Sequence, residues 1–271
     1  MDLTPIIGLI LGRVLVAVVM IMDGGSPAEL FAHPSAILLT VGGAIAATLV
    51  SFPMKKVTAL PKWFMKAFLG GGHEANHAIE MLTKMADKAR REGLLSLEDE
   101  AKKLDDEFLR KGIMMAVDGV DPAQVRSILE IDIHNLRERH EQGGIAFFSA
   151  AGGYGPTMGI IGTVMGLITV LKDLSDPGKL GESIAAAFLA TLWGILSANI
   201  IWLPLAGKLR SKSEEEVHYR RLLMEGILAL QAGENPRIVR EKLSAFLPPA
   251  ERAPSEGGEA APAGQKAKAG A

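Results

Sequence analysis

The 271-residue sequence contains no cysteine. Disulfide bonds, thiolate metal sites and cysteine nucleophiles are therefore excluded. Its six histidines are scattered without the spacing of metal ligands, so no metal site is expected. The chain also lacks the phosphate-binding loop, the serine-hydrolase elbow and the paired-histidine zinc motif. With no catalytic constellation, the sequence predicts neither an enzyme nor a bound cofactor.

An excess of charge of one sign is missing too. The 29 Lys and Arg residues nearly balance 31 Asp and Glu residues, for a formal net charge of -2. Without a dominant basic face, nucleic acid is not an expected partner. Hydrophobic residues make up 48% of the chain and gather in four long blocks, while the charges crowd into other segments. This separation favours a membrane protein over a soluble domain.

Four stretches are long and apolar enough to be transmembrane helices, at about residues 4–22, 35–52, 154–171 and 184–205. Each approaches the roughly 20 residues that cross about 30 Å of hydrocarbon as a helix. The first stretch could be mistaken for a signal peptide. However, it has no basic segment ahead of it, because Asp2 is its only charge before Arg13, and we expect it to be retained.

Basic residues predict the orientation of these spans. The loop of residues 23–34 has no Lys or Arg, whereas basic residues follow the second and fourth spans closely: Lys55, Lys56, Lys62, Lys66, Lys208, Arg210 and Lys212. Positive flanks face the cytoplasm. We therefore predict a multi-pass membrane protein with both termini in the cytoplasm.

The segments between and after the spans have helical patterns. Apolar residues recur at helical spacing over 79–89 and over 97–108, Gly93 separates these runs, and Asp121-Pro122 is typical of the start of a third helix. Beyond the fourth span, a helix should end at Gly233 and a short one should start at Asn235-Pro236. The last segment has no large apolar residue and is predicted to be disordered.

The predicted fold is thus an all-α integral membrane protein with four transmembrane helices and a helical cytoplasmic domain. Its parts are a first transmembrane hairpin (residues 1–52), a cytoplasmic helical domain (53–144), a second transmembrane hairpin (145–205), C-terminal cytoplasmic helices (206–249) and a disordered tail (250–271).

Small residues recur every three or four positions in the third and fourth spans: Gly155, Gly159, Gly162, Gly166, Ala186, Ala190, Gly194 and Ala198. Such faces let membrane helices approach closely. Two interpretations stay open at this point. The faces pack on each other within one chain, or they line a ring that holds another helix.

No Asp or Glu lies in any of the four predicted spans, and Arg13 is their one charged side chain. A proton relay normally needs an ionisable group at depth. Arginine is a poor relay, because its pKa exceeds about 12. If the chain belongs to an ion-driven machine, a partner helix must therefore supply the carboxylate.

Three groups of segments resemble the flagellar stator A subunits within the MotA/TolQ/ExbB proton channel family. They are residues 89–98, residues 155–167 with 190–194 and 203–206, and residues 225–237 with 246–249. The resemblance implies a homo-oligomeric ring, a pentamer, around a dimer of a B subunit. It also implies that an aspartate of the B subunit carries the ion, and that the ring drives the rotor protein FliG.

The resemblance assigns four charges to the contact with the rotor. Arg90 and Glu98 match the charged pair of the family that faces the rotor. Arg91 and Asp99 match neighbouring charges that some members also use. Taken without the resemblance, the same charges would be the solvated surface of a helical hairpin.

Four further residues match the ion path and its coupling to movement. Pro156 and Pro204 match two prolines that couple ion flow to movement, and Thr163 and Thr191 match hydroxyls that line the path. Simpler interpretations exist for both pairs. The prolines could mark helix ends, and each hydroxyl could bond a carbonyl of its own helix.

The transported ion is predicted to be a proton, with sodium left open. Sodium-type relatives carry a second hydroxyl just before the Thr191 position and often an acid in the first outside loop. This chain has Ala190 and His33 there instead. Losing an oxygen ligand weakens a site for a hard cation.

Other membrane functions compete with the stator interpretation. An energiser like TolQ or ExbB shares the inner ring, but it should lack the segment around Arg90 and Glu98 and the first hairpin. A secondary transporter acting alone should show an internal repeat or charges at the midplane. A purely structural scaffold is excluded only by the resemblance.

Overall fold

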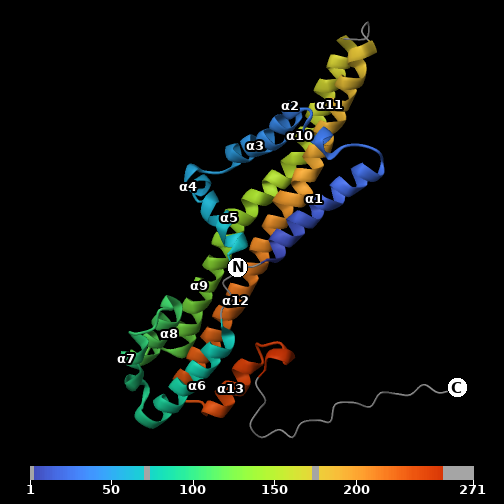
Figure 1. Cartoon of the computed structure of the whole chain (residues 1–271). Helices are drawn as coiled ribbons and strands as arrows, with labels where there is room; N and C mark the ends of the chain where they lie inside the picture. Colours follow the sequence, from blue (N-terminus) through green and yellow to red (C-terminus); the bar gives the residue numbers. More distant parts are fainter. Residues whose placement is uncertain (1–2, 70–73, 173–176, 253–271) are drawn as a thin grey trace, which may run out of the picture. The chain divides into compact units, whose positions relative to one another are not determined.

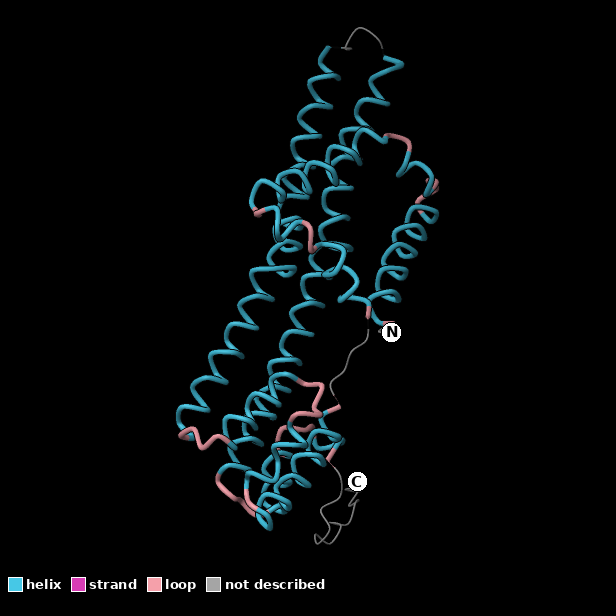
Figure 2. Tube along the Cα trace, turned by 90° about the vertical axis from the view of Figure 1, so that its left-hand side faces the viewer, coloured by secondary structure: helices cyan, strands magenta, loops and turns pink. Residues whose placement is uncertain are grey.

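The computed structural model describes residues 3–69, 74–172 and 177–252, and every regular element within these ranges is a helix (Figures 1 and 2). The chain divides into two compact units. Unit 1 comprises residues 1–72 and 132–217, and unit 2 comprises residues 73–131 and 218–271.

Four helices are long and apolar enough to cross a membrane, at Thr4–Met22, Pro34–Ser51, Pro122–Lys172 and Leu180–Gln231. This confirms the prediction of four spans. The last two helices continue well beyond the residues predicted to lie in the membrane. Unit 1 also takes in residues 53–72 and 132–144, which the sequence had assigned to the cytoplasmic domain.

Unit 1 contains α1 (Thr4–Met22), η1 (Pro27–Phe31), α2 (Pro34–Ile37), η2 (Leu38–Gly42), α3 (Gly43–Ser51), α4 (Met54–Val57), α5 (Leu60–Phe68), η4 (Glu141–Ile145), α10 (Ala146–Lys172), α11 (Pro177–Leu196) and η5 (Ser197–Trp202). It also contains the last part of α9 (Pro122–His140) and the first part of α12 (Leu203–Gln231). The segments η2, η4 and η5 are π-helical turns within otherwise α-helical runs.

The helices α10 and α11 lie side by side as an antiparallel hairpin because small residues face each other along it (Figure 1). An ideal Cβ placed on Gly194 would lie 2.7 Å from the Gly155 carbonyl oxygen. One placed on Gly166 would lie 2.6 Å from the Ala187 Cβ. The small faces are therefore used for packing within the chain. This confirms the first of the two interpretations, while the ring of the second stays a prediction.

The second span packs on α10 with its polar groups satisfied internally. A Cβ on Gly43 would lie 3.0 Å from the Met158 sulfur, so the Met158 side chain packs directly on the backbone of Gly43. Thr40 and Thr48 are fully buried, and their hydroxyls donate to the carbonyl oxygens of Ala36 and Ala44 at 2.8 and 2.7 Å. Because each hydroxyl bonds a carbonyl oxygen of its own helix, the cost of burying it is removed.

An aromatic cluster holds the start of α10 against α5 and α12. Phe147 packs 5.4 Å from Phe52 and 5.8 Å from Phe148, centroid to centroid, and the Phe148 ring stacks on Trp202 at 6.3 Å. Buried aliphatic residues of the same cluster are Ala67, Ile145, Leu205, Ala206 and Leu209. Fully burying one large apolar side chain, such as that of Phe147, stabilises the fold by about 1.5–3 kcal/mol.

A half-buried polar network lies in the same unit and joins α5, α9 and α12. The Lys66 ammonium donates to Glu216 at 3.2 Å and lies 3.4 Å from His140 Nε2. His140 Nδ1 lies 2.9 Å from the hydroxyl of the buried Ser213. The Lys212 ammonium donates to the carbonyl oxygens of Lys66 and Leu69 at the end of α5. Because each of these bonds joins two helices, the network fixes their spacing.

Unit 2 is a bundle of short amphipathic helices with the last part of α12. Its other elements are α6 (Ala75–Glu92), η3 (Leu94–Leu97), α7 (Glu98–Ala101), α8 (Glu107–Val117), the first part of α9, α13 (Pro236–Ser244) and η6 (Pro249–Glu251). The buried face of α6 includes Ile79, Leu82 and Met85, which confirms the first predicted amphipathic run.

The second predicted run, residues 97–108, is wrong as a single helix. The structure has η3, the short α7, a turn, and then α8. The side chain of Asp106 accepts a hydrogen bond from the Leu109 N–H at 3.0 Å and so starts a new helix. A strong N-cap inside an amphipathic pattern thus overrides the periodicity.

The other predicted helix ends are confirmed. Asp121 accepts from the Ala123 N–H at 2.9 Å and caps α9, whose first residue is Pro122. Asn235 accepts from the Arg237 N–H at 2.9 Å and caps α13. Gly233 follows α12 with a φ of 66°, a left-handed conformation that favours glycine. Of the predicted disordered tail, residues 253–271 lie outside the described residues, and η6 includes residues 250 and 251.

We predict that Gly194→Ala destabilises the α10–α11 hairpin by about 1–3 kcal/mol, because the added methyl group meets backbone atoms that cannot move aside. Gly181→Ala in the same helix is the matched control, since nothing lies within 4 Å of its Cβ position. Thermal unfolding of both variants in detergent checks this. Equal melting temperatures would contradict the tight contact.

Candidate functional site

The predicted site residues fall into two groups, one in each unit. Thr163, Thr191, Pro156 and Pro204 belong to unit 1. Arg90, Arg91, Glu98 and Asp99 belong to unit 2.

The structure brings Thr163 and Thr191 together. Their hydroxyl groups contact each other between α10 and α11. The Thr163 hydroxyl also lies 3.1 Å from the carbonyl oxygens of Gly159 and Ala187. It has a single proton to donate, so these acceptors compete for it. The simpler interpretation, in which each hydroxyl bonds a carbonyl of its own helix, holds only in part. The contact between Thr163 and Thr191 joins α10 to α11.

Neither predicted proline marks a helix end. Pro156 lies inside α10 and is half-buried. Pro204 is exposed and is the second residue of α12, which follows the π-helical turn η5 without a break. Proline lacks the N–H that would bond four residues back, so each leaves one carbonyl without its usual partner. A Cβ on Gly152 would lie 2.6 Å from a Leu203 methyl carbon, so the two prolines lie on facing segments.

The four predicted rotor-facing charges lie around one turn of unit 2. Arg90 and Arg91 end α6, while Glu98 and Asp99 begin α7. Gly93 joins them with a φ of 84°, which few residues other than glycine adopt. The Lys88 ammonium donates to Glu100 at 2.6 Å across this turn, and this hydrogen bond raises the pKa of Lys88. This hydrogen bond therefore holds α6 and α7 together.

The four charges differ in how far they are already paired. Arg91 binds Asp87 at 2.8 Å and Glu98 accepts from Lys102 at 2.7 Å, each one turn away in its own helical segment. Arg90 and Asp99 are exposed and make no ion pair with any residue that the structure describes. These two are the charges most available to another protein.

Sequence reasoning missed Leu95, which lies in η3 between the two charged segments and is 70% exposed. The other large apolar residues of unit 2 that are exposed to a similar degree are Ile131 and Ile238. Single exposed apolar residues are common on protein surfaces, so what singles out Leu95 is its position between the four charges. The signal in the sequence is the run Leu94-Leu95, of which only one member can face inward.

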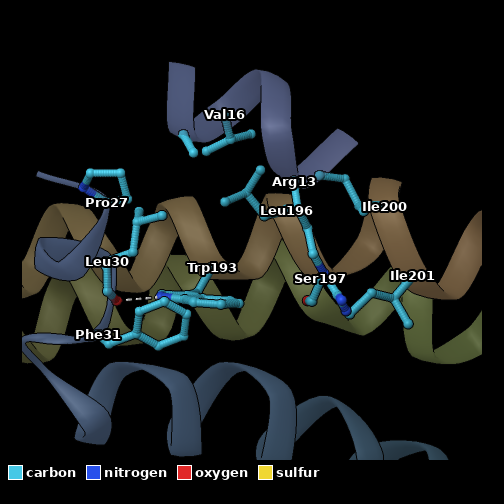
Figure 3. A pocket seen from close by; sticks show the side chains of 11 residues that line it. Arg13, Val16, Pro27, Leu30, Phe31, Trp193, Leu196, Ser197, Ile200 and Ile201 are labelled. Carbon is cyan, nitrogen blue, oxygen red and sulfur yellow. Dashed lines mark hydrogen bonds between the residues drawn. The ribbon is translucent and has the colours of Figure 1, made fainter. Parts of the chain in front are cut away.

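Arg13 is the second feature that sequence reasoning could not place. It lines a cavity of about 440 Å³ between α1 and the α11–η5 segment (Figure 3). On the far wall, the Trp193 indole N–H donates to the Leu30 carbonyl at 2.8 Å, which attaches η1 to α11. Within the part of the chain that the structure describes, no three His, Cys, Asp or Glu side chains form a metal site.

Two family models match the chain. Residues 100–222 match the MotA/TolQ/ExbB proton channel family, and residues 6–93 match the Motility protein A N-terminal family. Arg90 and Arg91 fall within the second match, whereas Glu98 and Asp99 lie between the two.

Characterised relatives extend over nearly the whole chain. Motility protein A of Bacillus subtilis is 40% identical over 253 residues, which is 93% of this chain and 93% of the relative. Chemotaxis protein PomA of Vibrio alginolyticus is 39% identical and aligns over 93% of this chain and 98% of its own.

Solved structures agree with these relatives. The chain is similar to a chain of the flagellar MotAB stator complex from Bacillus subtilis, with a TM-score of 0.86, 38% identity and coverage of 93% and 98%. It is equally similar to a chain of C. jejuni MotAB, with a TM-score of 0.86, 33% identity and coverage of 92% and 96%.

We predict that Thr163 and Thr191 are energetically coupled. In a double-mutant cycle with valine, which keeps the side-chain shape, the hydroxyl contact should give a coupling of about 0.6 kcal/mol and no more than about 1.7. A cycle of Thr163 with Thr169 should give none, since the Thr169 hydroxyl donates within its own helix to Met165 at 3.2 Å. Unfolding free energies in detergent measure both cycles, and additivity in the first would refute the coupling.

Proposed function

The chain belongs to the MotA/TolQ/ExbB proton channel family, and from this membership we propose that it acts as the A-type stator subunit of a bacterial flagellar motor. The observation that carries the proposal is the match to Motility protein A over 93% of both chains. The match of residues 6–93 to the Motility protein A N-terminal family favours this function over an energiser like TolQ or ExbB, because that region holds the first hairpin and α6.

A B subunit is the proposed partner that carries the ion. The predicted spans contain no Asp or Glu, so the chain has no carboxylate of its own at membrane depth. The similar solved complexes each contain MotA with MotB. A transmembrane aspartate of the B subunit would bind the ion in a pentameric ring of this chain in the inner membrane, with both termini of the chain in the cytoplasm.

The ion path is proposed to pass the Thr163–Thr191 contact. Both hydroxyls are half-buried and can exchange hydrogen-bond partners at low cost, because the Thr163 hydroxyl already has alternative acceptors. Neither group titrates, so they can solvate an ion or a hydrated carboxylate without storing charge. The ion is proposed to be a proton, since Ala190 offers no side-chain oxygen beside Thr191.

Energy is proposed to reach the rotor through movement of the helices. One elementary charge that crosses 100 mV releases about 2.3 kcal/mol. Protonation of the partner's carboxylate would remove its charge and so change which arrangement of the ring is most stable. Pro156 and Pro204 lie in segments with interrupted backbone hydrogen bonds, where a small rearrangement costs least.

The surface around Arg90, Leu95 and Asp99 is the proposed contact with the rotor protein FliG. Exposed ion pairs contribute about 0–1 kcal/mol each, so such contacts can form and release repeatedly. Charges steer the encounter between the two proteins, and an apolar side chain at the centre adds affinity. The chain is not proposed to be an enzyme.

We predict that the chain restores swimming to a stator-deleted host only when its B subunit is also expressed. Swimming with and without sodium would support protons, whereas swimming only in sodium would overturn that assignment. The chain expressed alone should neither restore swimming nor leak protons. Stable complexes that never restore swimming in the host of their own FliG would contradict the stator function.

We predict that Arg90→Glu removes most of the torque without changing membrane assembly, because a reversed charge meets like charge on the rotor. Arg91→Glu should have the smaller effect, since Arg91 is already paired with Asp87. Arg240→Glu, at an exposed position of α13, serves as the control. Tethered-cell rotation measures torque, and full torque in Arg90→Glu would remove this residue from the contact.

A further inference from the structure

Arg13 is a charge that no described residue of the chain neutralises. It lies at the middle of α1, and at the centre of a membrane helix an arginine costs about 2.5–3.5 kcal/mol on insertion scales. It makes no hydrogen bond or ion pair with any residue that the structure describes. Intramembrane cations are normally paired, so an anion is expected from elsewhere.

The side chain of Arg13 extends into the cavity and toward Ser197 and Ile201 (Figure 3). No lining residue can serve as its anion. Ser197 donates to the Gly194 carbonyl at 3.1 Å, and the indole N–H of Trp193 is bonded to Leu30. The remaining walls are apolar: Val16, Ala17, Pro27, Leu30, Phe31, Leu196, Ile200 and Ile201.

A second cavity of about 460 Å³ continues the first along α1. The two share Ile200 and Ile201, and the second extends to Thr4 on α1 and Lys208 on α12. We refer to both together as the α1 groove. Its walls are mostly apolar, with Thr4 and Asn199 as further polar residues, and it has Arg13 at its middle and Lys208 at one end. Lys208 lies seven residues after Ile201, which is about 10 Å along the helix. The long cationic side chains of Arg13 and Lys208 can span this distance from its two ends.

The anion cannot come from the spans of a second copy of this chain, because an identical chain also lacks Asp and Glu in its predicted spans. The aspartate proposed for the B subunit is assigned to the ion path at Thr163 and Thr191, whereas Arg13 faces a separate cavity beside α1. A small soluble anion would have to enter hydrocarbon unaccompanied, which is very costly. A lipid brings an anionic headgroup and an apolar chain together.

We propose that the α1 groove binds an acidic phospholipid of the cytoplasmic leaflet. Its phosphate lies between Arg13 and Lys208, and its acyl chain lies in the cavity lined by Val16 and Trp193. The guanidinium can bind phosphate oxygens through two parallel hydrogen bonds. Basic pockets between helices on the cytoplasmic side are suited to such headgroups. The inference rests on the proposed orientation, with the start of α1 and Lys208 toward the cytoplasm.

The test is phospholipid binding to the purified complex of this chain with its B subunit, followed by native mass spectrometry. Wild-type complexes should bind phosphatidylglycerol in preference to phosphatidylcholine, and Arg13→Leu should weaken phosphatidylglycerol binding by about tenfold or more, as expected for a charge-assisted hydrogen bond. Arg13→Lys should retain part of it. Lys172→Leu, at the opposite end of the spans, is the matched control and should bind as wild type does.

Photo-crosslinking from a reactive residue at Val16 identifies the occupant directly. Crosslinks to phosphatidylglycerol that disappear in Arg13→Leu would support the proposal. Crosslinks to protein alone, or equal binding of both lipids in wild type and Arg13→Leu, would overturn it. These readouts are independent of swimming, so they separate failure of the lipid site from failure of the stator function.

Discussion

The contact between α10 and α11 is the constraint on which the rest of unit 1 depends. A Cβ on Gly155 would lie 2.9 Å from the Gly194 carbonyl oxygen, so the helices meet backbone to backbone. That approach places Thr163 against Thr191 and brings the start of α12 beside the start of α10. The aromatic cluster around Phe147 and Phe148 can then form. Larger residues on these faces would push α10 and α11 apart and break the hydroxyl contact.

Charge is distributed so that the chain depends on other molecules. The predicted spans carry no acid, which is why ion binding is proposed to fall to a B subunit, and Arg13 has no ion pair with any described residue, which is the basis for the proposed lipid. In unit 2, by contrast, most charges near the turn at Gly93 have partners, while Arg90 and Asp99 have none among the described residues. In both places, the charges without a partner are those that the proposals assign to another molecule.

Much of the fold follows from local signals in the sequence. Hydropathy predicted four spans, and the Asp121-Pro122 and Asn235-Pro236 pairs located two helix starts. The break before Asp106 was missed because apolar spacing continued through it. The roles of the site residues came from resemblance rather than from periodicity. The cavity around Arg13 could not be predicted, because it depends on which distant segments pack beside α1. For Leu95, the run Leu94-Leu95 indicated that one of the two leucines is exposed, but not which one.

The π-helical turn η5 lets this membrane helix hold an extra residue without changing which face of α12 meets its neighbours. A π turn holds about one residue more than an α turn, whereas in a regular α-helix each residue corresponds to a rotation of about 100°. Removing one residue from η5 would therefore let the turn become α-helical and leave Leu205 and Leu209 facing the aromatic cluster, while a deletion within regular α11 or α12 would rotate every residue after it. In this helix, η5 is thus the place where evolution could add or remove a residue while the packed faces on both sides stay in register.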